Sequence, residues 1–229
     1  MSNFKFGEKP DVHKRRSKFN LNHNLKTTLT VGDLVPFLVQ EVYPGDTFRV
    51  KSNQVNRITS SFVKAPMDNL FLDTFYFFVP NRLVMDKWAE LNGENKKSKW
   101  AQTEDIQVPQ LHFKSKDGNN VVDNTTGTLA DYFGIPTNGA MDGRSLPSIS
   151  ALPFRAYALI FNDWFRDENN QDPVHIKTDQ TPEYINDLEF SANNYTGKVA
   201  KINKLHDYFT SCLPAPQKGD PVNIPEMLR

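Results

Sequence analysis

The stretch that decides the fold is Leu70-Phe71-Leu72-Asp73-Thr74-Phe75-Tyr76-Phe77-Phe78-Val79. Both alternating sets of its residues are apolar, and a strand with two apolar faces is covered on both sides. At the rise of a strand, ten residues span about 33 Å, which is long for a globular protein. Pro80 ends the stretch because proline cannot donate a hydrogen bond to a sheet. The pattern therefore predicts a long central strand over residues 70–79.

The sequence before this stretch predicts several further strands. Candidates cover residues 25–30, 33–43, 47–51 and 57–64. No long helix interrupts them, and strands at such short spacing favour antiparallel sheets in a sandwich or barrel. We therefore expect a mainly β fold in which residues 25–80 supply strands.

The sequence after Pro80 predicts helices and long loops. A helix is expected from Leu83 to Leu91, a hairpin around Lys116-Asp117-Gly118-Asn119, and a helical turn over 128–133. The strongest helix covers 151–166, with Ser150 as its N-cap and an apolar face that leaves out Arg155. A last short helix is expected over 199–210. The side chains expected to form the core are Phe71, Phe75, Phe77, Phe154, Phe161 and Trp164.

Charge is unevenly distributed along a chain of 229 residues whose formal net charge is zero. Residues 1–26 hold seven Lys and Arg against Glu8 and Asp11, a net charge of +5. A basic arm on an acidic body is typical of proteins that contact nucleic acid. Residues 1–24 are read as this arm, and a solvated tail is the open alternative. Its candidate phosphate contacts are Lys9, His13, Lys14, Arg15, Arg16 and Lys18.

Composition and motifs exclude several classes of protein. No phosphate-binding loop, dinucleotide turn, nucleophile elbow or zinc-protease motif is present, and the five histidines lack ligand spacing. We therefore expect no enzyme activity, no metal and no cofactor. The single cysteine, Cys212, excludes a disulfide framework within the chain. No apolar window reaches membrane-span length and no signal peptide is recognisable, so we expect no membrane insertion.

Four segments closely resemble the major capsid proteins of microviruses, specifically the gokushovirus branch. They are 65–82, which contains the stretch quoted above, Leu129-Ala130-Asp131-Tyr132-Phe133-Gly134-Ile135-Pro136, 150–169, and Tyr208-Phe209-Thr210-Ser211-Cys212-Leu213-Pro214-Ala215-Pro216-Gln217-Lys218-Gly219. The segments follow the family order along the whole chain. This resemblance implies a viral jelly roll of eight strands with large loop and helix insertions.

The resemblance also implies a function and a set of partners. Copies of the protein would assemble, in the cytoplasm of a bacterial host, into a small T=1 icosahedral shell around circular single-stranded DNA. The basic arm would face the packaged genome. Other implied partners are internal or pilot proteins of the virion and a host-cell receptor. Residues 25–229 would form the jelly-roll domain, with insertions over 81–229.

One departure from the family concerns length. Family members are about twice as long, and they continue beyond the segment Pro214-Ala215-Pro216-Gln217-Lys218-Gly219. We therefore expect an N-terminal portion with an incomplete jelly roll and open sheet edges. Such a portion would be poorly soluble or would depend on the C-terminal part.

Two other functions stay open on residues alone. A lectin-like jelly roll would bind carbohydrate through its loops, and an exposed aromatic platform would favour it. A hydrolase on a β-scaffold would need a pocket with convergent carboxylates, for which the sequence shows no candidate pair.

Overall fold

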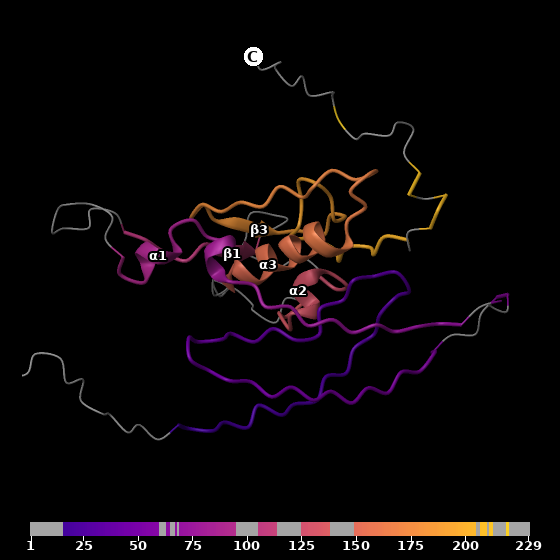
Figure 1. Ribbon diagram of the computed structural model, residues 1–229, viewed down its shortest axis with the longest axis horizontal. Coiled ribbons are helices and arrows are strands. Elements are labelled where there is room, and N and C mark those ends of the chain that lie inside the picture. Colours follow the sequence, from indigo (N-terminus) through magenta and orange to yellow (C-terminus); the bar gives the residue numbers. More distant parts are fainter. Residues whose placement is uncertain are drawn as a thin grey trace, which may run out of the picture.

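The helices and strands gather in one region, and long segments without regular structure extend from it (Figure 1). The computed structural model describes residues 16–59, 63–64, 67, 69–94, 105–113, 125–137, 149–204, 207–209, 211–212 and 219. The elements are, in order, η1 (Asn81–Leu83), α1 (Trp88–Leu91), β1 (Gln110–Phe113), α2 (Leu129–Tyr132), β2 (Ile149–Ser150), α3 (Leu152–Ile160), η2 (Phe161–Phe165) and β3 (Glu183–Ile185). η1 is a 3-10 helix and η2 a π-helix.

The sheet is small and mixed. β1 lies in the middle, antiparallel to β2 and parallel to β3. Leu111 of β1 pairs with both Ile149 and Glu183, so segments far apart in the sequence meet at one buried residue. The hairpin predicted around 116–119 lies outside the described residues.

The predicted helix over 151–166 is confirmed, as α3 followed directly by η2. The N-cap is Ala151 and not the predicted Ser150, whose hydroxyl accepts a hydrogen bond from the Leu152 N–H at 3.3 Å. Pro153 lies in the first turn, where no N–H is needed. The apolar face packs into the core, whose buried members are Leu111, Leu129, Ala130, Ala151, Phe154, Tyr157, Ala158, Phe161, Phe165, Val174, Ile185, Tyr195, Val199 and Ala200.

Trp164 departs from the expected face of this helix. Its side chain is 71% exposed, whereas the neighbouring Phe165 is buried. An α-helix turns by about 100° per residue, and a π-helix turns by less because each of its turns holds more residues. The sequence pattern placed Trp164 on the apolar face, and the π-helical geometry of Phe161–Phe165 turns it away from that face. The expectation that Trp164 belongs to the core is therefore wrong for this chain.

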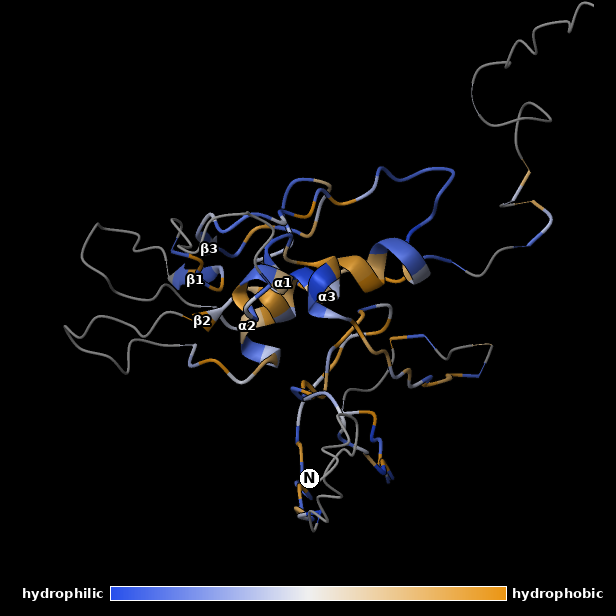
Figure 2. Cartoon of the chain, turned by 60° about the vertical axis from the view of Figure 1, so that its left-hand side comes forward, coloured by the Kyte–Doolittle hydropathy of each residue, from blue (hydrophilic) through white to orange (hydrophobic). Residues whose placement is uncertain are grey.

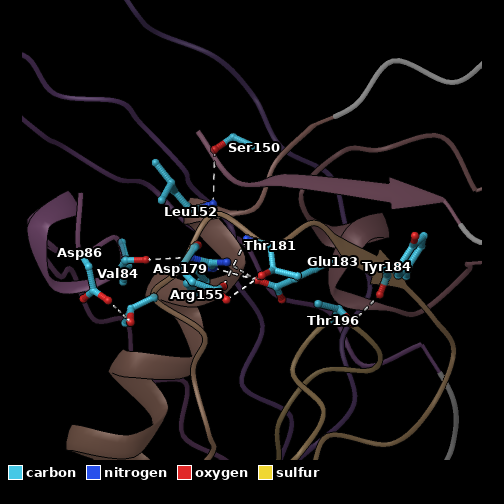
Figure 3. A network of polar contacts seen from close by, with 11 residues as sticks. Val84, Asp86, Ser150, Leu152, Arg155, Asp179, Thr181, Glu183, Tyr184 and Thr196 are labelled. Carbon is cyan, nitrogen blue, oxygen red and sulfur yellow. Dashed lines mark hydrogen bonds and ion pairs between the residues drawn. The ribbon is translucent and has the colours of Figure 1, made fainter. Parts of the chain in front are cut away.

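Arg155 is the polar centre of the core (Figure 3). It is 0% exposed, although the sequence pattern placed it off the apolar face of the helix. Its Nε donates to Oε1 of Glu183 at 2.8 Å, and its Nη2 lies 2.7 Å from the same oxygen. Its Nη1 donates to the carbonyls of Val84 and Asp179 at 3.1 and 2.9 Å. One side chain of α3 therefore joins β3, the segment after η1 and the loop before β3.

Tyr157 connects the N-terminal part of the chain to the core through hydrogen bonds of its hydroxyl. Its hydroxyl donates to the carbonyl of Leu34 at 2.7 Å and accepts from the Ala200 N–H at 2.8 Å. The Leu34 N–H donates to the Ala200 carbonyl, and the Ile202 N–H donates to the Gly32 carbonyl, each at 2.8 Å. Because residues 200–202 are bound in this extended pairing, the helix predicted over 199–210 is wrong for residues 199–204, and only a turn is present at 207–209.

The strands predicted before Pro80 are not formed. In the described part of residues 16–80 the only sheet-type pairing is an isolated bridge of Asp33 with Lys201. No residue of 16–59 is buried, and only 32–37 are half-buried. The structure thus has extended segments where strands were expected, because a strand exists only when a neighbouring backbone pairs with it. Of the predicted mainly β fold, the described residues contain only the small three-stranded sheet.

Replacing Arg155 tests its role in the core. Arg155→Met keeps the apolar stem but leaves the buried Glu183 carboxylate without its cation. We expect the free energy of unfolding to fall by about 3–5 kcal/mol, measured by proteolysis across a urea series. The control Arg49→Met removes an exposed guanidinium and should change that free energy by less than about 0.5 kcal/mol. Equal effects of the two variants would contradict the assignment.

The Tyr157 contacts predict a loss of stability at alkaline pH. Burial raises the pKa of the Tyr157 hydroxyl above its ordinary 10.0, and the Asp33 carboxylate adds to the shift. The unfolded chain therefore loses this proton first, so the contribution is complete below about pH 10 and declines as the pH rises further. Tyr157→Phe should reduce the unfolding free energy by about 1–3 kcal/mol at neutral pH and flatten the alkaline decline. An unchanged alkaline slope in urea titrations would argue against this.

Candidate interaction surface

The residues from Leu70 to Val79 form an exposed row of apolar side chains, which we call the aromatic strip. Two of its rings touch the end of the helix. Phe75 lies edge-on to Phe165 with ring centroids 5.4 Å apart, and Phe77 lies 5.9 Å from Phe165 and 5.7 Å from Trp164. Edge-to-face pairs contribute about 0.5–1.5 kcal/mol each beyond burial. These contacts hold the strip against η2.

Most of the strip nevertheless lies in solvent. Phe71 and Phe78 are 81% and 74% exposed, and Phe75, Tyr76 and Phe77 are also exposed. Figure 2 shows hydrophobic residues along the extended segments as well as in α3. Contiguous exposed apolar surface of this kind marks interaction sites in soluble proteins.

The six residues expected in the core therefore separate into two groups. Phe154 and Phe161 are buried at 1% and 5% exposure. Phe71, Phe75, Phe77 and Trp164 are exposed. The strip is exposed because no second layer of described residues covers it. Among the described residues outside the strip, its rings pair only with those of Phe37 and of Trp164 and Phe165 in η2.

A small pocket lies where the strip meets the helix. It has a volume of about 90 Å³ and is lined by Phe77, Phe78, Val79, Leu83, Leu159, Ile160, Asp163 and Trp164. The Asp163 carboxylate is the one charged group of the lining. Ligand pockets usually reach ~300 Å³ or more, so this pocket fits a single apolar side chain better than a small molecule.

The backbone of the strip is unpaired within the described residues. No N–H or C=O of residues 70–79 forms a hydrogen bond with another described segment. The polar contact of the strip is through a side chain, with Nε2 of Gln54 donating to Oγ1 of Thr74 at 2.8 Å. Buried backbone groups are almost always hydrogen-bonded, so a partner that covers this surface must also supply backbone groups.

The basic arm is described only in part. Arg16 and Lys18 are exposed on extended chain, whereas Lys9, His13, Lys14 and Arg15 lie outside the described residues. The described residues bring no phosphate-binding cluster together around Arg16 and Lys18. They also contain no group of three or more His, Cys, Asp or Glu placed to hold a metal, and none of their helices has the length and apolarity of a membrane span.

The strongest structural residues were not predicted as such from the sequence. Arg155 carries no local signal of burial, because its partners Glu183 and Asp179 come from a distant loop and strand. Burial and the Glu183 carboxylate raise the pKa of the adjacent Tyr195 hydroxyl. A cation, a carboxylate and a phenol thus share one buried site, in which the Arg155–Glu183 ion pair joins α3 to β3.

Comparison with known proteins decides the family. The profile of the phage family described as capsid protein (F protein) matches residues 8–227. This chain belongs to that family. The resemblance predicted from the sequence segments is confirmed, and with it the assignment to a family of structural capsid proteins rather than enzymes.

Three relatives show how much of a capsid protein the chain represents. It is 37% identical to capsid protein VP1 of Bdellovibrio phage phiMH2K and 39% identical to capsid protein VP1 of Chlamydia phage 1, each over 96% of its length. It is 36% identical to capsid protein VP1 of Spiroplasma virus 4 over 93% of its length. It spans only 36–37% of the length of these relatives. These relatives therefore exceed the length of this chain by more than the factor of two that the resemblance implied.

Paired substitutions test whether the strip lies outside the self-sufficient core. Phe71→Ser should change the free energy of unfolding by less than about 0.5 kcal/mol and reduce binding of a hydrophobic dye. Phe154→Ala removes a buried ring that packs edge-on against Phe133, and should reduce that free energy by about 3–5 kcal/mol. Equal destabilisation by the two variants would show that the strip is already buried.

Proposed function

We propose that this chain works as a structural capsid protein whose copies assemble into a small icosahedral shell around circular single-stranded DNA. The observation that carries the proposal is the family match over residues 8–227, together with relatives that are capsid proteins VP1. The site of action is then the virion, and assembly takes place in the cytoplasm of a bacterial host.

We further propose that the finished fold is the viral jelly roll. Its strands come in part from residues 25–80, and residues 81–229 contribute insertion loops and helices. The apolar pattern of the extended segments and the absence of any buried residue in 16–59 support this, because such segments need a second layer to cover them. The region of α3 and the small sheet is packed without that layer.

The mechanism is burial of apolar surface, not catalysis. Removing apolar area from water contributes about 25 cal/mol per Å², and stable interfaces bury about 1,600 Å² in total. The aromatic strip and the exposed apolar side chains of 38–59 are the described surface suited to such burial. Which of them meet a neighbouring copy and which meet the same protomer depends on the completed jelly roll.

The basic arm over residues 1–24 is the proposed contact with DNA. Lys9, His13, Lys14, Arg15, Arg16 and Lys18 would neutralise phosphates, which gives affinity without base specificity. The exposure of Arg16 and Lys18 on extended chain is compatible with this role. Internal or pilot proteins and a host-cell receptor stay predictions from the family resemblance.

A lectin-like function is less well supported. The exposed aromatic residues Phe77, Phe78 and Trp164 meet its first expectation. Sugar binding also needs several polar groups that converge on the ligand, and the pocket beside these rings offers one carboxylate, Asp163. The surface is better suited to apolar packing.

Assembly can be tested directly. Expressing the whole reading frame that encodes these residues in bacteria should give shell-like particles by electron microscopy, and nuclease should not digest their DNA. Soluble protein that sediments only as monomers at high concentration would contradict the proposed function.

Charge substitutions test the arm. With Lys9, Lys14, Arg15, Arg16 and Lys18 changed to Gln, the affinity for single-stranded DNA should fall. The slope of log affinity against log salt should become less steep by about 3.5, at ~0.7 per phosphate contact. The control Lys9→Arg/Lys14→Arg/Lys18→Arg keeps the charge and should keep that salt dependence. An unchanged salt dependence in the Gln variant would mean that the arm is a solvated tail.

A further inference from the structure

The pocket between the aromatic strip and the helix combines a carboxylate with aromatic rings. The Asp163 side chain is exposed and forms no hydrogen bond or ion pair with another described residue. Trp164 and Phe77 line the pocket with it, and their ring centroids lie 5.7 Å apart with the ring planes inclined by 52°. The exposed Phe78 is a third ring of the same lining. One unpaired negative charge and three aromatic rings therefore surround a single small volume.

The π-helix η2 brings the carboxylate and the indole to this pocket together. The sequence pattern placed Trp164 on the apolar face, and the π-helical geometry turns it away from that face. Asp163 and Trp164, which are neighbours in the chain, consequently both line the pocket. Short π-helical turns within α-helices occur frequently at functional sites. Core packing accounts for the buried Phe161 and Phe165 of η2, whereas the indole of Trp164 stays accessible to a ligand.

The chemistry of the lining favours a cation that carries an apolar chain. Aromatic rings attract ammonium groups, and the indole of tryptophan does so most strongly. A carboxylate such as that of Asp163 accepts charge-assisted hydrogen bonds from N–H groups and repels anions. Methylene groups next to a cation pack well on apolar walls, and the remaining walls are the aliphatic side chains of Val79, Leu83, Leu159 and Ile160.

The volume and the charge of the pocket narrow the choice of ligand further. The volume of about 90 Å³ equals that of roughly three water molecules, which suits an ammonium group with a short chain of methylenes and is too small for a sugar or a nucleobase. A neutral apolar group would fit the aliphatic walls, but it would displace water from Asp163 without replacing the lost hydrogen bonds. A primary ammonium group supplies both the positive charge and the N–H donors.

We propose that this pocket is a binding site for a primary alkylammonium group. Asp163 is the anionic partner of the ammonium, and Trp164 and Phe77 form the aromatic wall beside it. Leu159 and Ile160 contact the methylenes. Two sources share this chemistry, a lysine side chain of a second copy of the chain and a small free amine. The site is independent of the proposed function, because it binds an ammonium group whether or not the protein forms shells.

Titration of the full chain of 229 residues with n-butylammonium tests the site. The matched neutral probe is 1-butanol, which has the same chain length, and both titrations are made at neutral pH and constant ionic strength. The readout is the indole N–H resonance of Trp164 in two-dimensional NMR, identified by its absence from Trp164→Phe. n-Butylammonium should shift this resonance saturably, and 1-butanol should bind at least ~5-fold more weakly because it lacks the charge.

Two carboxylates offer a matched pair of variants. Asp163→Asn keeps the size of the side chain and removes its charge, so it should weaken n-butylammonium binding about 5-fold and leave 1-butanol binding unchanged. Asp172→Asn removes an exposed carboxylate that lies outside the pocket lining, and it should leave both affinities unchanged. Both changes are on the surface, so the core that surrounds α3 should keep its stability.

The dependence on protein concentration separates the two sources of the ammonium group. If a second copy supplies a lysine, the Trp164 resonance should move as the chain is concentrated, and n-butylammonium should reduce self-association measured by sedimentation. If the ligand is a free amine, the resonance should not depend on protein concentration.

Three results would overturn the site. They are equal affinities for n-butylammonium and 1-butanol, equal effects of Asp163→Asn and Asp172→Asn, and the absence of a saturable shift with n-butylammonium at low protein concentration. Each result stands apart from shell formation, which tests the proposed function instead.

Discussion

The buried guanidinium of Arg155 sets the arrangement of the core. A buried cation is tolerated only when its donors find partners, and here these are the Glu183 carboxylate and the carbonyls of Val84 and Asp179. Glu183 also pairs with Leu111 in the sheet, so the ion pair fixes where β3 lies against β1 and where α3 lies against both. A residue outside the apolar stripe of the helix thus decides which distant segments that helix meets.

The extended N-terminal segments are held in place by contacts with the core, whereas most of the core packs without them. One main attachment is the pairing of residues 32–34 with residues 200–202, where Leu34 also binds the Tyr157 hydroxyl. The other is the packing of Phe75 and Phe77 against η2. Elsewhere their apolar side chains lie in solvent. Exposed apolar segments of this kind are suited to burial against neighbouring polypeptide.

The sequence predicted local features well and long-range pairing poorly. The apolar period of 151–166 gave the helix, and Gly134 ends the predicted turn at Leu129–Tyr132, because these signals lie within a few residues. The apolar pattern of the aromatic strip identified a surface that must be covered but not what covers it. The burial of Arg155, the parallel pairing of β1 with β3 and the extended path of 200–202 depend on partners distant in sequence. The exposure of Trp164 follows from a π-helix, for which the sequence has no clear signal.

The central claim is that a self-sufficient core carries extended segments that nothing within the described chain covers. Limited trypsin digestion of the chain of 229 residues, followed by mass spectrometry, tests it most directly. The claim predicts early cleavage after the exposed Arg49, Lys51 and Arg57 and late cleavage after the buried Arg155. Cleavage at Arg155 as fast as at Arg49 and Arg57, or equal resistance at all four positions, would contradict it.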